Sequence, residues 1–200
     1  MAKLPILLLA AGEALRMRQP KQMLLWDGMP LINSRIETIQ ATGQPIIVVL
    51  GANAPLILPI INQLNVKVIV NKQWNNGMSS SIEAGTKYIQ DEFPDSEGII
   101  IALVDQPMIS TKHFCRLIDH FQSGEKQIIQ SVSANGWEGV PVIFDRYYFD
   151  DLQQLTSGEG AKSVIRRYPD KVVKIVAEDC LEDIDTPERY FELKKLFCND

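Results

Sequence analysis

The sequence predicts a doubly wound α/β domain with a mostly parallel sheet and helices on both faces. Short apolar segments alternate with amphipathic ones along the whole chain, which is the pattern of successive β–α–β units. Most of the apolar segments are continuously hydrophobic, as in strands that helices cover on both sides. Because 200 residues fit one core, we expect a single domain over residues 1–200.

Seven apolar segments are predicted strands, the first rich in leucine and the others in β-branched residues. They span Leu4–Ala10, Pro45–Leu50, Val66–Val70, Gly98–Val104, Gln127–Val132, Val140–Phe144 and Val172–Val176. Lys3 and the apolar run after it superficially resemble a secretory signal with a small-residue cleavage site. The run is short for such a signal and continues directly into a basic loop with a glycine, so we interpret it as a buried first strand.

Seven amphipathic segments are predicted helices. They span Leu31–Ala41, Ala54–Gln63, Ser80–Asp91, Thr111–Phe121, Phe149–Leu155, Ala161–Tyr168 and Pro187–Phe197. Ser110 or Thr111 is placed to cap the fourth, and Thr186-Pro187 is a typical start for the last. In sheets of this kind ligands bind beyond the carboxyl ends of the strands, so the residues that follow each strand are the candidates for chemistry.

Charge and cysteine content limit the class of function. The formal charge of −5 argues against nucleic acid or an anionic membrane as a partner, because either requires lysine and arginine clustered over one face. No apolar run approaches the roughly 18 residues of a membrane span. Cys115, Cys180 and Cys198 are widely separated, which favours neither a disulfide framework nor a zinc site. We therefore expect a reducing, cytoplasmic compartment.

The loop after the first predicted strand combines small residues with positive charge. Small residues at 10–12 let a ligand approach the backbone, and successive N–H groups in such a turn bind anions. Arg16, Arg18 and Lys21 make this loop basic on an acidic protein. Arg16 and Lys21 are placed to neutralise a triphosphate. The loop is neither a Walker A motif nor G-x-G-x-x-G, and its small residues by themselves also fit an ordinary tight turn.

Residues 9–24 read LAAGEALRMRQPKQML. This segment resembles the signature L-A-[AG]-G-x-S-x-R-M-G-x-x-K-x-L of MobA-like nucleotidyltransferases, and is closest to their molybdenum cofactor cytidylyltransferase branch. The resemblance implies a Rossmann-like fold of the nucleotide-diphospho-sugar transferase type, and transfer of a nucleotide to molybdopterin with release of pyrophosphate. Two positions depart from the pattern. Ala14 replaces a serine and removes a hydroxyl, while Arg18 replaces a glycine and adds bulk and charge.

Two further segments resemble the same family. Residues 74–82, WNNGMSSSI, resemble its W-x-x-G-M-x-x-S segment. Hydroxyls and free N–H groups at a helix start suit a base edge or a phosphate, although a serine there is also an ordinary cap. Residues 103–108, LVDQPM, close the strongest central strand and resemble the segment L-x-D-x-P, whose aspartate binds the metal. Mg²⁺ prefers carboxylate oxygen, so Asp105 is the predicted magnesium ligand.

Three C-terminal segments complete the resemblance. Gly136–Phe144 resembles G-x-x-G-x-P-V-x-F, which implies a place beside the acceptor pterin. Trp137 fits two interpretations there, stacking on a flat ring or a surface aromatic. Residues 155–162 match L-x-G-D-x-G-A-[RK] loosely, and the role of Glu159 in them stays open. The DIDTP segment implies that Asp185 is the second metal ligand, although it also fits a helix cap, and the role of Asp183 stays open.

The resemblance thus implies three groups of site residues. Nucleotide contacts are expected from Leu9, Ala10, Ala11, Gly12, Arg16, Lys21, Asn71, Gly77, Ser79, Ser80, Ser81 and Asp105, of which Lys21, Arg16 and Asp105 act in catalysis. Acceptor contacts are expected from Gln106, Pro107, Trp137, Gly139 and Pro141. The expected cofactor is Mg²⁺, with Asp105 and Asp185 as its ligands.

No nucleophilic side chain is required, because an acceptor phosphate oxygen can attack the α-phosphorus in line while the protein positions the groups and neutralises charge. CTP is the expected donor, since the methyl of Ala11 narrows the base pocket where the guanylyl branch has glycine. The other expected partners are a molybdopterin-type acceptor and, transiently, a molybdoenzyme or its chaperone. Two alternatives stay open. One is a guanylyl- or other nucleotidyltransferase with a different phosphorylated acceptor. The other is a non-catalytic carrier, which Ala14 and Arg18 keep open. The presence of Lys21, Asp105 and Asp185 argues against the carrier.

Overall fold

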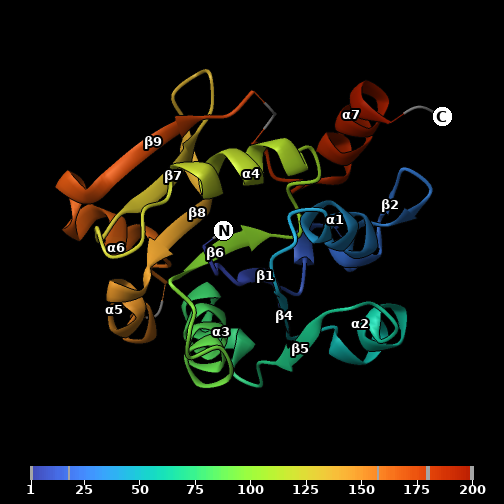
Figure 1. Cartoon of the computed structure of the whole chain (residues 1–200). Helices are drawn as coiled ribbons and strands as arrows, with labels where there is room; N and C mark the ends of the chain where they lie inside the picture. The colour runs from blue at the N-terminus through green and yellow to red at the C-terminus, as the bar shows by residue number, and fades with distance from the viewer. Residues whose placement is uncertain (1, 18, 157, 179–180, 199–200) are drawn as a thin grey trace.

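One seven-stranded sheet organises the computed structural model, which describes residues 2–17, 19–156, 158–178 and 181–198 (Figure 1). The strand order is β5-β4-β1-β6-β8-β7-β9. The strands span Ile6–Ala10 (β1), Ile46–Leu50 (β4), Lys67–Val70 (β5), Gly98–Leu103 (β6), Ile128–Val132 (β7), Glu138–Asp145 (β8) and Val172–Val176 (β9). All strand pairs are parallel except those that β8 makes with β6 and β7. The predicted mostly parallel sheet and its seven strands are therefore confirmed.

The antiparallel direction of β8 follows from a hairpin that joins it to β7. The turn contains Asn135-Gly136, and Gly136 has a φ of 84°, a left-handed conformation that glycine adopts without strain. The backbone N–H of Ser133 donates to the carbonyl of Trp137 across the turn, at 2.8 Å. Because β8 is reversed, its first residues lie at the same edge as the carboxyl ends of β6 and β7.

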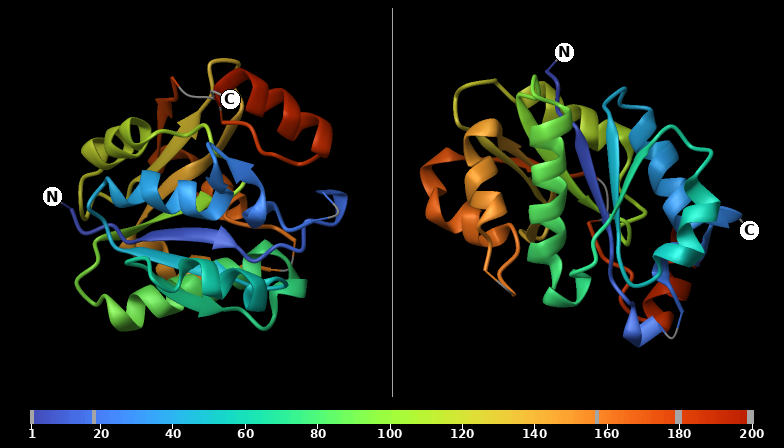
Figure 2. Two further views of the ribbon diagram at one scale, coloured as in Figure 1. Left: turned by 90° about the vertical axis from the view of Figure 1, so that its right-hand side faces the viewer. Right: turned by 90° about the horizontal axis from the view of Figure 1, so that it is seen from below.

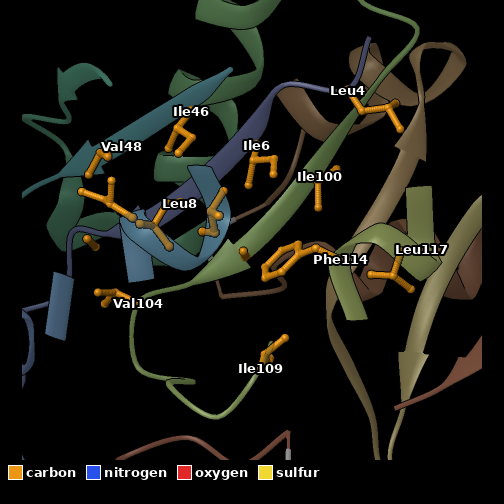
Figure 3. Close-up of a cluster of buried hydrophobic side chains, with 14 of the residues drawn as sticks. Leu4, Ile6, Leu8, Ile46, Val48, Ile100, Val104, Ile109, Phe114 and Leu117 are labelled. Carbon is orange, nitrogen blue, oxygen red and sulfur yellow. The ribbon is translucent and has the colours of Figure 1, made fainter. Parts of the chain in front are cut away.

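Six helices cover the two faces of the sheet, as predicted. On one face lie α1 (Leu31–Gln40), α2 (Ala54–Ile61) and α4 (Thr111–His120), and on the other α3 (Met78–Glu92), α5 (Phe149–Gln153) and α6 (Lys162–Arg167). Alternate residues of β1 serve the two cores: Ile6 and Leu8 pack under the first set and Leu7 under the second. Figure 3 shows the first core, with Phe114 of α4 facing the sheet. On the second face α3 and α5 lie side by side (Figure 2).

A third, smaller core ties the two ends of the chain together. A short hairpin of β2 (Leu25–Trp26) and β3 (Met29–Pro30) was not predicted, although its Asp27-Gly28 turn is a strong hairpin signal. The last helix, α7 (Pro187–Phe197), packs Tyr190 and Leu193 against Trp26 and Leu31, and lies beside α1 and β2 in Figure 1. Because α7 packs there, the segment between β9 and α7 runs along the carboxyl edge of the sheet to the ends of β6 and β1.

The described residues contain neither a membrane-spanning helix nor a disulfide. None of the helices they form combines the length and the apolar character that crossing a bilayer requires. Cys115 and Cys198 form no disulfide there. Arg18 and Cys180, both used in the sequence analysis, lie outside the described residues.

Candidate active site

The loop after β1 is held in a fixed shape by buried contacts. Gln22, which is 2% exposed, donates from Nε2 to the carbonyls of Ala10 at 2.7 Å and Gly12 at 3.3 Å. On the opposite side Gly51 leaves no room for a side chain, because a Cβ there would lie 2.5 Å from the Ala11 carbonyl and 2.6 Å from the Trp74 Cβ. A Cβ on Gly12 would meet nothing within 4 Å. The protein therefore fixes Ala11 from behind and leaves Gly12 open for a ligand.

Lys21 lies between two carboxylates that come from distant parts of the chain. Its Nζ donates to Asp105 Oδ2 at 2.8 Å and to Asp185 Oδ1 at 2.6 Å. Asp105 directly follows β6 and Val104, whereas Asp185 belongs to the long loop between β9 and α7. Burial opposes the charge on Lys21, but the two carboxylates outweigh it and hold the pKa of the ammonium group above its ordinary value. Lys21 is therefore a fixed cation at this edge of the sheet.

A cavity of about 280 Å³ lies beside this ion triad, and we call it the first cavity. Its described lining comprises Leu9, Ala10, Ala11, Gly12, Ala14, Lys21, Gln22, Trp74, Gly77, Met78, Ser81, Leu103, Val104 and Asp105. Most of the predicted nucleotide residues thus converge on one space, together with Trp74 and Met78, which the sequence analysis did not select. Arg16 lines an adjacent hollow that also includes Gly12, Lys21 and Asp185.

Three predicted nucleotide residues, Asn71, Ser79 and Ser80, are buried and do not belong to the described lining of the first cavity. Asn71 is buried, and its Nδ2 donates to the hydroxyls of Ser80 at 2.9 Å and Ser81 at 3.0 Å. The Ser80 hydroxyl in turn donates to the carbonyls of Gln73 and Gly77, both at 2.9 Å. These hydrogen bonds tie the start of α3 to residues 71–77.

A second cavity of about 310 Å³ adjoins the first, and Met78 and Leu103 line both. Trp137 and Gly139, two of the five predicted acceptor residues, belong to its wall. A Cβ on Gly139 would overlap the Trp137 indole, so the glycine lets the ring lie against β8. The ammonium of Lys162, which the sequence analysis did not select, lies 5.5 Å from the centre of that ring. The second cavity is thus largely apolar, with one aromatic wall.

The other three predicted acceptor residues are buried and absent from the described lining of either cavity. Gln106 is fully enclosed, and the carbonyls of Pro107 and Pro141 accept hydrogen bonds from Arg35 and Ser131. Proline cannot donate a backbone hydrogen bond, and its carbonyl remains available for such structural contacts. These positions shape the loop after β6 and the strand β8.

Asp183 lies where the second cavity meets a third hollow that also includes Asp185. Burial and then the negative charge of Asp105 raise the pKa of the Asp183 carboxyl to about 6, while the amide of Gln106 acts in the opposite direction. The ionised form is therefore unfavourable in the folded protein, and the penalty appears as the pH rises.

This penalty predicts a pH-dependent gain in stability for Asp183→Asn. Below about pH 3 the carboxyl is mostly protonated in the folded and unfolded states alike, so the substitution changes little. Above pH 6 only wild type carries the cost of a half-buried charge, and we expect the variant to gain roughly 1–2 kcal/mol at pH 8 after allowance for solvent screening. Urea unfolding at both pH values measures this difference, and an equal gain at both would contradict the assigned burial penalty.

The fold and the geometry agree with a known family. Residues 6–172 match the model of the MobA-like NTP transferase domain. The chain belongs to the MobA-like NTP transferase family. It is similar to nicotine blue oxidoreductase from Paenarthrobacter nicotinovorans, with 30% identity over 93% of this chain and 94% of that protein. Molybdenum cofactor cytidylyltransferase from Escherichia coli strain K12 is 22% identical over 98% of both chains.

Solved structures place this MobA-like NTP transferase in the same fold. The manganese complex of Rv0371c from Mycobacterium tuberculosis H37Rv has a TM-score of 0.81 and 23% identity, with coverage of 97% of this chain and 99% of that one. The predicted family and the predicted nucleotide-diphospho-sugar transferase type of fold are therefore confirmed.

The donor set of this MobA-like NTP transferase fits a divalent cation that a substrate brings with it. Among the described residues no group of three or more histidine, cysteine or acidic side chains is placed to hold a metal. Asp105 and Asp185 together supply two carboxylates around one point, now occupied by Lys21 Nζ. Mg²⁺ commonly binds through one or two carboxylates, with phosphate oxygens and water as its other ligands.

Proposed function

We propose that this protein transfers CMP from CTP to the phosphate of a molybdopterin-type acceptor, with Mg²⁺ as cofactor, and releases pyrophosphate in the cytoplasm. The observation that carries the proposal is the position of Lys21 between Asp105 and Asp185, beside a cavity walled by residues 9–12. Opposite charges fixed in this way suit a bound triphosphate and its metal. Similarity to the cytidylyltransferase supports the choice of acceptor.

The two adjoining cavities accommodate donor and acceptor. A nucleotide in the first cavity would lie against residues 9–12 and Trp74, with its phosphates near Gly12 and Lys21 and with Arg16 in the adjacent hollow. An acceptor ring in the second cavity would lie against Trp137. Because Met78 and Leu103 line both cavities, an acceptor phosphate in the second would lie close to the α-phosphate of a nucleotide in the first.

The reaction itself is an in-line displacement. An acceptor phosphate oxygen forms a bond to the α-phosphorus, while the bond from that phosphorus to the bridging oxygen breaks and its electron pair leaves with pyrophosphate. Lys21 neutralises charge on the departing phosphates, and Arg16 provides a second cation in the adjacent hollow. When bound by Asp105 and Asp185, Mg²⁺ would supply further charge neutralisation to the phosphate oxygens. The remaining task of the protein is to hold the two phosphates in line.

Two glycines next to the first cavity offer a matched pair of substitutions. Gly51→Ala is expected to destabilise the fold by about 1–3 kcal/mol, because the new methyl overlaps Ala11 and Trp74. Gly12→Ala meets open space, so we expect unchanged stability but weaker CTP binding, since a ligand approaches the backbone there. Thermal melting and calorimetric titration of CTP separate the two effects. A Gly12→Ala variant that binds CTP normally would show that the nucleotide lies elsewhere.

A pyrophosphate-release assay tests the proposal, with each nucleoside triphosphate in turn, molybdopterin and Mg²⁺. We expect turnover with CTP and little with GTP, since the Ala11 methyl narrows the base pocket. Turnover with GTP alone would identify a guanylyltransferase. No pyrophosphate with any triphosphate would exclude transfer to molybdopterin and leave the carrier or a transferase with a different phosphorylated acceptor. In that case the 30% identity to nicotine blue oxidoreductase makes a test of oxidoreductase activity with nicotine blue the next assay.

A further inference from the structure

Gln106 occupies an enclosed position between the two loops that carry the acidic residues of the site. Its side chain is fully buried, and Nε2 donates to the carbonyl of Leu181 at 2.9 Å. Beside it the carbonyl of Asp105 accepts a hydrogen bond from the N–H of Ile184 at 2.8 Å. Two hydrogen bonds therefore join the segment after β6 to residues 181–184, directly before Asp185.

The segment after β6 is also fixed from its other side. Arg35 of α1 is 1% exposed, and its Nη1 donates to the carbonyls of Pro107 at 3.2 Å and Ile109 at 2.7 Å. A buried guanidinium requires such partners, because leaving its N–H groups unpaired is costly. Arg35 of α1 thus holds the segment that follows Asp105 in place. The hydrogen bond of Gln106 then ties this segment to the loop that carries Asp185.

Asp185 depends on this connection more than Asp105 does. Asp105 immediately follows a central strand, whereas Asp185 lies in a long loop and its side chain is 54% exposed. Leu181 and Ile184 are buried and anchor the loop, but apolar contacts do not fix its register in the way that a hydrogen bond does. A pair of carboxylates binds a cation tightly only when both are held in place beforehand.

We propose that Gln106 is a positioning residue that sets the separation of Asp105 and Asp185, and so the affinity of this pair for a divalent cation. This inference rests on the metal role in the proposed function. Gln106 itself touches neither the nucleotide nor the cation. Its Nε2 hydrogen bond acts through Asp185, by restricting the conformations of the loop before α7.

The test is Gln106→Met, which keeps the size of the side chain and removes the donor. Gln130→Met is the matched control, since Gln130 is a buried glutamine of β7 outside both cavities. Mn²⁺ binding in the presence of CTP is followed by electron paramagnetic resonance. We expect Mn²⁺ to bind Gln106→Met about 10-fold more weakly than wild type, which is the smaller end of the range for changes to residues that hold a metal ligand in place. The Mn²⁺ affinity of Gln130→Met should be unchanged. The rate kcat of Gln106→Met should fall while KM for CTP stays close to wild type.

A double-mutant cycle with Asp185→Asn separates positioning from general damage. If Gln106 acts through Asp185, Gln106→Met has no further effect on Mn²⁺ affinity once Asp185 is asparagine. An equal loss in both backgrounds, or no loss in either, overturns the inference. Unchanged Mn²⁺ affinity for Asp185→Asn alone would overturn the metal pair as well, so the two failures are distinguishable. Gln106→Asn, which keeps an amide too short to reach Leu181, repeats the test should the methionine variant not fold.

Discussion

Replacing Asp105 by asparagine is expected to lower the rate of nucleotidyl transfer by at least about 10²–10³-fold, the usual scale for loss of one preorganised charge at a reacting phosphate. The Asp105 carboxylate is one of the two that accept hydrogen bonds from Lys21. Its negative charge would bind the metal ion that accompanies the triphosphate. The amide has nearly the same shape. The backbone carbonyl of residue 105 would still accept from Ile184, so folding should be almost unaffected.

A steady-state assay of pyrophosphate release with CTP measures this loss, and thermal melting checks the fold. Asp95→Asn is a suitable control, because Asp95 forms an exposed ion pair with Lys3 before β6 begins, away from the carboxyl edge. Its variant should retain full activity, since exposed ion pairs contribute little. An Asp105→Asn enzyme with an unimpaired rate would refute the metal assignment.

Removing the charge of Lys21 should produce two effects of opposite direction. In Lys21→Met the phosphates lose their fixed cation, and we expect turnover to fall by about 10²–10³-fold. Without nucleotide, however, Asp105 and Asp185 are left facing one another with no cation between them. Divalent ions should then bind the free protein more tightly, by about 10-fold or ~1.4 kcal/mol.

Mn²⁺ titration of the nucleotide-free protein tests the second effect independently of catalysis. Lys112→Met is the control, as Lys112 pairs with Glu178 on the surface and should alter neither quantity. Weaker Mn²⁺ binding by Lys21→Met would show that the two carboxylates do not form one cation site. Turnover of Lys21→Met tests the role of the cation in catalysis, and its Mn²⁺ affinity tests whether Asp105 and Asp185 act as one cation site.

Most of the architecture follows from local patterns in the sequence. The strands and helices were predictable because runs such as 46–50 are apolar throughout and lie between amphipathic segments. The direction of β8 was also accessible, since Asn135-Gly136 joins two strands with no helix between them. The loop after β1 and Asp105 were predicted as parts of the site because ligands of such sheets bind at the carboxyl ends of strands.

The division of labour among the site residues was not predictable, because it depends on where side chains turn after the strands end. Asp105 and Gln106 are neighbours in sequence, yet one faces the first cavity and the other is enclosed against Leu181. Ser80 and Ser81 likewise differ, since only Ser81 belongs to the described lining of that cavity. Gly51 followed an apolar strand in the sequence, but its contact with Trp74 arises only in the folded chain.

The third core has a consequence for the order of events during synthesis. Asp185 lies just before α7, whose Tyr190 and Leu193 pack against Trp26 and Leu31. A nascent polypeptide that has left the ribosome as far as β9 therefore has every strand of its sheet and Lys21, but no Asp185. Because Asp185 is made after every strand of the described sheet, we expect the ion triad of Lys21, Asp105 and Asp185 to form only once α7 has packed into the third core.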